Sequence, residues 1–223
     1  MGDTDAIFAR YKIIISPNMK KQIKPRYNIS PSQMVPVIRQ NEKKELIMEM
    51  MRWGLIPSWA KDPVIGNKMI NARAESVAEK PSFKYSLKNH RCLIPASGFY
   101  EWENTDEGKI PHYVYIKEEP VSSFAGLYDI WNDSENREIK TFTIITTKAN
   151  KILEPIHNRM PVILDKKQED IWLNNDIQDT NILAKLLIPY PSKKMTEYII
   201  SRIVNSTLNE GGNLIHPLNK KVK

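Results

Sequence analysis

The stretch RCLIPASGFYEWE, residues 91–103, decides how the middle of the chain folds. Residues 91–96 are rich in apolar side chains, which favours a β-strand. Residues 98–103 alternate in a pattern of period two, which favours a second strand. The same stretch holds the chain's only cysteine, Cys92, and nine residues later the carboxylate Glu101. It therefore predicts β structure and poses the question whether Cys92 is a nucleophile or a packed core residue.

Further segments rich in β-branched and aromatic residues follow this stretch. We expect strands at 112–117, 122–131 and 138–146, with polar turns or loops at 104–111 and 132–138. Residues 91–147 are therefore predicted to be mostly β.

Helices are predicted at fewer places, over 81–87, 166–174 and 179–188. Asp165 and Gln168 form a capping pair for the second of these helices. The third has Asp179 or Thr180 as its cap and ends at Pro189. Because the strands and helices do not alternate as βαβ units, the sequence predicts an α+β fold.

Composition limits the class of protein. The 223 residues suffice for one large domain, which we expect to span 1–223 with a basic tail at 218–223. A single cysteine excludes an internal disulfide, and no apolar run approaches the roughly 20 residues of a membrane span. The N-terminus has no basic segment leading into an apolar one, so we expect a cytoplasmic protein without a signal peptide.

Charge and motifs narrow the possible ligands. The net charge of +7 suits a polyanionic partner, although lysines on a solvated surface would also account for it. Four scattered histidines and one cysteine have no metal-ligand spacing, and no phosphate-binding glycine loop is present. We therefore expect neither a metal nor a cofactor.

Three polar residues stand at alternate positions in the segment GNKMINARAES. If this segment is extended, Asn71, Arg73 and Glu75 project from one face. An amide, a guanidinium and a carboxylate on one face could bind a phosphate and a sugar. An exposed strand face with a local Arg–Glu pair would explain the same pattern.

Glu101 lies in a strand flanked by aromatic residues. Phe99, Glu101 and Glu103 would share one face of this strand, and Tyr100 and Trp102 the other. Partly apolar surroundings disfavour the charged carboxylate and raise its pKa, which suits acid–base chemistry. The alternative is a solvent-facing acid on a half-buried sheet.

His157 belongs to a short polar island of three residues, 157–159, bracketed by Pro155 and Pro161. Histidine titrates near neutral pH and is the usual proton carrier, and the prolines would hold the backbone rigid. A histidine that caps a turn is the alternative. A thiol hydrolase that pairs Cys92 with His157 would require the two side chains within hydrogen-bond reach.

Two tryptophans, Trp53 and Trp59, lie close together near basic residues. Exposed indoles beside lysine and arginine stack nucleobases in proteins that bind single strands. Both indoles could instead be core, which is our interpretation of Trp53. Trp59 lies between a proline and a charged turn and is the better candidate for a surface platform.

These stretches also occur in an order that resembles the SRAP family, the SOS-response-associated peptidases, also described as abasic-site processing proteins. The resemblance covers about residues 8–217 and is carried by RYNISPSQ (26–33), MRWGLIPSWAKD (51–62), INARAES (70–76), RCLIPASGFYEW (91–102), TIITTKAN (143–150), IHNRMPVIL (156–164) and VN (204–205). It implies a single α+β domain whose mixed β-sheets form a pseudo-barrel with peripheral helices. It also implies a monomer with a basic cleft for single-stranded DNA that carries abasic sites.

The resemblance assigns roles to residues of these motifs. Asn71 would orient the sugar, Arg73 would hold a DNA phosphate, and Glu101 and His157 would carry protons. Thr146, Ser201 and Asn205 lie in matching segments and would line the cleft. In the family, an N-terminal cysteine captures the aldehyde of the opened abasic sugar as a thiazolidine crosslink, and the same residue underlies the peptidase label.

The N-terminus departs from the family pattern Met-Cys-Gly-Arg-Phe. Aligned at Phe8, this chain has Asp5 in place of the cysteine, Ala6 in place of the glycine and Ile7 in place of the arginine, and residues 1–7 form an atypical extension. Three explanations stay open: an altered start of the sequence, a relative that binds DNA without the thiol, and a lyase that uses the N-terminal amine as a Schiff base. Whether the chain is an enzyme is therefore left open.

Overall fold

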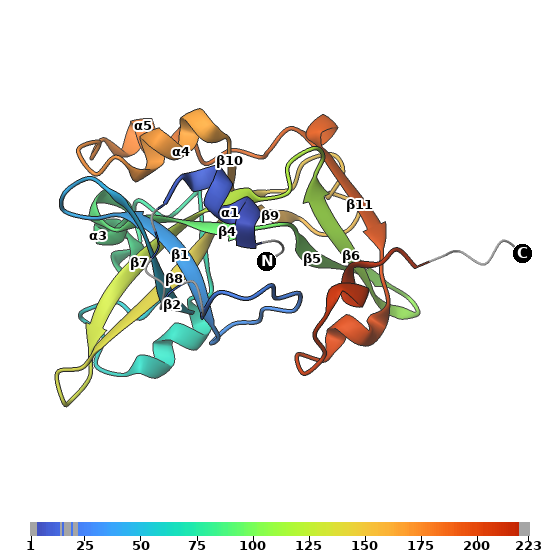
Figure 1. The fold of residues 1–223 in the computed structure, drawn as a ribbon, viewed down its shortest axis with the longest axis horizontal. Coiled ribbons are helices and arrows are strands. Elements are labelled where there is room, and N and C mark those ends of the chain that lie inside the picture. The colour runs from blue at the N-terminus through green and yellow to red at the C-terminus, as the bar shows by residue number, and fades with distance from the viewer. Residues whose placement is uncertain (1–3, 14, 16–18, 20–21, 219–223) are drawn as a thin grey trace, which may run out of the picture.

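Five strands close into a barrel within the part of the chain that this computed structural model describes, residues 4–13, 15, 19 and 22–218 (Figure 1). The barrel strands are β1 (Met34–Gln40), β2 (Leu46–Trp53), β4 (Arg91–Ala96), β7 (Ser122–Asn132) and β8 (Glu138–Lys148). They follow the order β7-β4-β1-β2-β8, and the pairing of β7 with β8 closes the ring. All these neighbours are antiparallel except β2 and β8, which run parallel.

Short strands extend the barrel wall near the end of β8. β3 (Asn71–Arg73) pairs with β8 in parallel, and β9 (Arg159–Pro161) pairs with it antiparallel. Thr146 on β8 is the register partner of both Arg73 and Pro161. A further strand, β10 (Ile163–Leu164), pairs with β7. These pairings bring residues that are distant in sequence to one rim of the barrel.

A second sheet packs beside the barrel (Figure 1). It contains β5 (Phe99–Thr105), β6 (Gly108–Ile116) and β11 (Met195–Ile199), in the order β11-β6-β5, so β5 is an edge strand. One face joins the barrel core, where the Phe99 and Phe124 rings meet edge to face at 5.8 Å. The other face carries aromatic rings, including the stacked pair Tyr113 and Tyr115.

Helices cover the barrel at its periphery. The described α-helices are α1 (Thr4–Tyr11), α3 (Pro81–Asn89), α4 (Lys166–Leu173) and α5 (Thr180–Ala184), and the short 3-10 segments are η1 (Pro63–Lys68), η2 (Ser192–Lys194), η3 (Arg202–Asn205) and η4 (Gly212–Ile215). The indole of Trp172 on α4 is fully buried and donates to the carbonyl of Cys92 at 3.0 Å. This contact fixes α4 against β4.

Arg91 joins the C-terminal ends of α3 and α4. Its guanidinium is buried and donates to the carbonyls of Leu87, Lys88, Trp172 and Asn174, at distances between 2.5 and 2.8 Å. Burial lowers the pKa of Arg91 to about 10. A cation beside the last carbonyls of two helices is favourable, because those ends carry partial negative charge.

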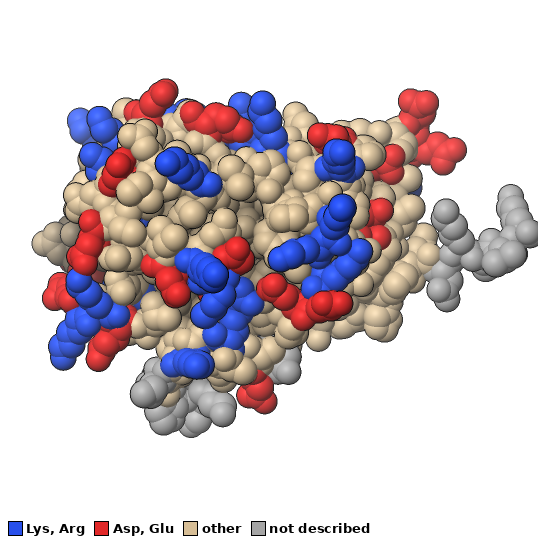
Figure 2. All heavy atoms as spheres, turned by 90° about the horizontal axis from the view of Figure 1, so that it is seen from above, with Lys and Arg blue, Asp and Glu red and all other residues tan. Residues whose placement is uncertain are grey.

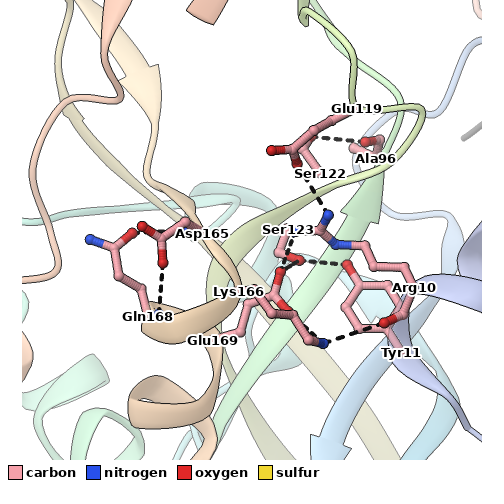
Figure 3. A network of polar contacts seen from close by, with 10 residues as sticks. All are labelled: Arg10, Tyr11, Ala96, Glu119, Ser122, Ser123, Asp165, Lys166, Gln168 and Glu169. Carbon is pink, nitrogen blue, oxygen red and sulfur yellow. Dashed lines mark hydrogen bonds and ion pairs between the residues drawn. The ribbon is translucent and has the colours of Figure 1, made fainter.

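A buried acid anchors α1 (Figure 3). Glu169 on α4 accepts from Arg10 and from the hydroxyl of Ser123, both at 2.5 Å. Ser123 in turn accepts from the hydroxyl of Tyr11, whose pKa is raised by burial. Ile7 is fully buried in the same region. The helix is therefore docked by apolar contacts and by a charged network.

Most of the predicted elements are confirmed, and so is the α+β class. The capping box at Asp165 and Gln168 is present, and Asp179 caps α5. The predicted loop at 104–111 is wrong: β5 and β6 pair as far as Thr105 and Gly108, so only two residues form the turn. Gly108 takes a φ of 105°, a conformation that favours glycine in this tight turn.

Two further differences concern element ends and missed strands. The helix predicted over 179–188 ends at Ala184, where bonds from Leu186 to Leu183 and from Leu187 to Ala184 tighten the chain into turns. β1 and β2, which form two-fifths of the barrel, were not predicted from the sequence. Among the described residues, no helix combines the length and hydrophobicity needed to cross a membrane.

Candidate functional site

A cavity of about 670 Å³ opens between the barrel rim and the second sheet. Its wall includes residues of all five barrel strands and the start of β5. Six of the residues predicted from the sequence line it: Asn71, Arg73, Glu101, Thr146, His157 and Asn205. Trp59 and Ser201 are not in its lining. The fold therefore gathers one group of polar side chains from several separate segments.

Glu101 reaches the cavity from edge strand β5. Its carboxylate lies 3.6 Å from Nδ1 of His157, and its side chain is 20% exposed. Burial raises the pKa of Glu101 to about 7, and the charge of His157 and the backbone N–H of Trp102 counter part of this effect. Near neutral pH this carboxyl group therefore exists in both protonation states.

His157 is presented by the loop that follows β8. The side chain of Asn150 accepts from the backbone of Ile152 and Leu153, and the backbone N–H of His157 donates to the carbonyl of Leu153 at 2.8 Å. Nδ1 of His157 also lies 3.3 Å from both the N–H and the carbonyl of Arg159. It can accept from the first or donate to the second, so both tautomers are accommodated.

Asn71 and Arg73 stand on β3 on either side of buried Ala72, and both side chains are exposed. The guanidinium of Arg73 makes no hydrogen bond or ion pair with another described residue, whereas its backbone carbonyl accepts from the N–H of Ser76. Glu75 lies beyond the end of β3 and binds the guanidinium of Arg159, with distances of 2.7 and 3.0 Å. The alternative of a local pair between Arg73 and Glu75 is therefore wrong.

Arg159 is a site residue that the sequence analysis missed. It lines the cavity, and besides Glu75 it donates to the carbonyl of Thr146. The sequence feature that could have identified Arg159 was its place in the polar island beside His157. Its partner Glu75, however, is far away in sequence. Only the pairing of β3 and β9 with the same strand brings the two together.

The two predicted tryptophans have different positions. Trp59 is 59% exposed, as expected for a surface residue, but lies apart from the cavity. Trp53 lines the cavity, stacks on Phe142 with 6.3 Å between ring centroids, and donates to the carbonyl of Ile70. A third indole, Trp102, also lines the cavity and donates to the side-chain oxygen of Asn205 at 2.8 Å.

The position of Cys92 shows whether it is a nucleophile or a packed core residue. Its side chain is fully buried, burial raises the pKa of its thiol, and it is not part of the cavity wall. A buried apolar thiol is inert. The thiol hydrolase that pairs Cys92 with His157 is therefore wrong, and Cys92 is a core residue. Within the described residues, no group of three or more histidines, cysteines and acids could hold a metal ion.

Comparison with known proteins places this geometry in a family. The sequence model described as SOS response associated peptidase (SRAP) matches residues 3–207. The chain belongs to the SRAP family. It is similar to a Bacillus subtilis protein named abasic site processing protein YoqW, with 48% identity over 192 residues that cover 86% of this chain and 85% of YoqW.

More distant relatives share the SRAP domain. Abasic site processing protein HMCES of Xenopus tropicalis is 33% identical over 215 residues, which cover 83% of this chain and 64% of HMCES. A crystal structure of a protein from Bacteroides thetaiotaomicron is 32% identical, covers 97% of both chains and superposes with a TM-score of 0.87. The predicted SRAP fold is confirmed.

The N-terminal positions of this SRAP chain lie on α1. Asp5, which stands where the resemblance places the cysteine, is exposed, and Ile7 is buried in the core. No described residue from 4 to 13 lines the cavity. Residues 1–3, which include the candidate N-terminal amine, lie outside the described residues. The described cavity wall contains neither a cysteine nor a lysine.

Proposed function

We propose that this SRAP chain binds single-stranded DNA in the cavity and processes abasic sites there. The observation that carries the proposal is the pair formed by Glu101 and His157, 3.6 Å apart, with the pKa of Glu101 raised to about 7. Two relatives named abasic site processing proteins support the choice of substrate. We further propose that the chain acts as a monomer in the cytoplasm.

Each polar side chain has a proposed role. An abasic sugar opens to an aldehyde when a proton reaches its ring oxygen, and His157 is proposed to supply that proton. Glu101 accepts or returns protons near neutral pH, because both of its forms are populated there. Arg73, whose guanidinium has no partner among the described residues, would bind a phosphate, and Asn71 would orient the sugar.

The group that attacks the aldehyde of the opened sugar is the remaining element of the proposed reaction. With Asp5 at the cysteine position, we propose that the reaction does not use a thiol there. A free α-amine at the start of the chain would condense with the aldehyde, lose water and form an imine, assisted by Glu101. The alternative is binding and protection of the abasic site without a covalent step.

A gel experiment separates these outcomes. The protein is incubated with single-stranded DNA that carries one abasic site and is run on a denaturing gel, with and without borohydride. We expect a shifted band or strand cleavage; a band that requires borohydride indicates an imine. DNA with a tetrahydrofuran analogue, which has no aldehyde, serves as the control and should remain unshifted.

Variants connect the result to the cavity. Glu101→Gln should lower the yield at least tenfold, because general acid–base groups contribute about 10²–10⁴-fold. Glu107→Gln, in the exposed turn between β5 and β6, is the matched control and should behave as wild type. The proposal is overturned if the protein binds abasic and intact DNA equally well and reacts with neither, and if Glu101→Gln changes neither result.

A further inference from the structure

One histidine outside the cavity wall links all three strands of the second sheet. His112 on β6 is 6% exposed. Its Nδ1 lies 2.6 Å from a carboxylate oxygen of Glu197 on β11, and its Nε2 lies 3.3 Å from one of Glu103 on β5. Both ring nitrogens of a buried imidazole thus face acids.

This geometry sets a requirement on protons. A neutral imidazole has one N–H donor and one lone pair, and an ionised carboxylate only accepts hydrogen bonds. Both contacts are hydrogen bonds only when the three groups share one additional proton, on the second ring nitrogen or on one carboxyl group. Without it, a nitrogen lone pair faces a carboxylate oxygen, and that contact becomes repulsive.

The cluster adjoins the proposed proton carrier. Glu101 is the direct partner of His112 in the antiparallel register, so the two side chains share a face of the sheet. Glu103 is the next residue of β5 on that face, and on the cavity side Glu101 meets His157. Among the described residues, Glu103 and Glu197 are the only charged groups that form an ion pair with His112.

We propose that Glu103, His112 and Glu197 form a proton-dependent lock that positions Glu101. With the additional proton, the cluster ties edge strand β5 to β6 and β11. When that proton is lost, the contact between Nε2 and Glu103 breaks, and the end of β5 that carries Glu101 loosens beside His157. The consequence for catalysis rests on the proposed function, whereas the lock itself operates without DNA.

Amide hydrogen exchange of the free protein, measured over a series from about pH 5 to about pH 9, tests the lock. After correction for the intrinsic exchange rate, protection of residues 99–105 should fall about tenfold as pH rises, since one charge-assisted hydrogen bond is lost. Protection of the β1–β2 hairpin is the internal reference for changes in global stability, and residues 99–105 should lose more protection than this hairpin does.

Glu103→Gln gives the decisive comparison. Its amide N–H can donate to the Nε2 lone pair while Nδ1–H donates to Glu197, so both contacts are satisfied with a neutral ring. Protection of β5 should depend less on pH in this variant than in wild type, and the dependence that remains is the one due to Glu101, whose pKa is raised to about 7. Glu107→Gln, on the exposed turn of the same hairpin, should keep the wild-type dependence. An identical pH dependence in Glu103→Gln and wild type overturns the lock.

The activity assay separates this inference from the proposed function. The processing yield of wild type should decline at alkaline pH, and Glu103→Gln should retain its yield to higher pH. If exchange responds as expected but no abasic DNA is processed, the lock stands and the proposed function fails. If DNA is processed but Glu103→Gln changes neither profile, the proposed function stands and the lock fails.

Discussion

At the scale of single residues, Glu101 shows how burial creates a usable acid. A glutamate ordinarily ionises well below neutral pH, and the walls of the cavity shift this equilibrium upward. The nearby His157 limits the shift, because a positive charge favours the carboxylate. The result is a carboxyl group that can both give and take a proton at neutral pH.

This shift predicts a stability cost. A carboxyl group whose pKa rises from 4.5 to about 7 on folding binds its proton more tightly in the native state, so stability falls as pH rises through that interval. Glu101→Gln removes this dependence. Its free energy of unfolding, relative to wild type, should increase by about 2 kcal/mol between about pH 5 and pH 8.

Urea unfolding of both proteins at the two pH values measures this difference. Glu107→Gln is exposed and should show no such change. A constant difference between Glu101→Gln and wild type would mean that the Glu101 carboxyl group titrates alike in the folded and unfolded chains.

At the scale of elements, the position of α1 depends on Glu169 (Figure 3). This carboxylate is buried and satisfies Arg10 and Ser123, while Lys166 approaches it to 3.3 Å. Removing the acid from such a network leaves a partly buried guanidinium and a hydroxyl without their acceptor, which is far costlier than losing a surface ion pair.

Glu169→Ala should therefore lower the free energy of unfolding by about 3 kcal/mol or more and release α1. Limited proteolysis or hydrogen exchange over residues 5–13 reports the release, and urea unfolding reports the stability. Asp170→Ala, at the exposed neighbouring position of α4, is the matched control. Equal exchange over residues 5–13 in both variants would show that apolar contacts such as Ile7 suffice to hold the helix.

At the scale of the whole molecule, the net charge of +7 does not produce a continuous basic surface on every face. Figure 2 shows acidic and basic side chains interleaved on the face seen from above, where α1, α4 and α5 lie in Figure 1. Arg10 and Lys166 in this region are already paired with acids. The proposed DNA contact relies instead on individual cations such as Arg73 at the cavity.

The salt dependence of DNA affinity tests whether Arg73 contacts a phosphate. For single strands, each phosphate contact adds about 0.7 to the slope of log affinity against log salt. Arg73→Ala should weaken binding to single-stranded DNA and reduce the magnitude of this slope by about 0.7, measured by fluorescence anisotropy over a salt series. Lys84→Ala, exposed on α3, should leave both values unchanged, and an unaltered slope in Arg73→Ala would exclude a phosphate contact at that residue.

Local signals in the sequence predicted several parts of the fold because they depend on near neighbours. The capping box at Asp165, the alternation around Glu101 and the apolar run containing Cys92 all reflect interactions within a few residues. β1 and β2 pair locally as a hairpin but escaped prediction, because a proline interrupts the first, MVPVIRQ, and the second, LIMEMMRW, is rich in residues that also favour helices.

The sequence by itself determined which side chains this protein can use: the motifs around Asn71, Glu101 and His157, the SRAP resemblance, and the absence of a second cysteine. Tertiary structure alone decided that Glu101 meets His157, that Glu75 binds Arg159, and that Trp59 lies apart from the cavity. The physical reason is that residue type and spacing control local conformation, whereas contacts across the cavity require barrel closure and sheet packing.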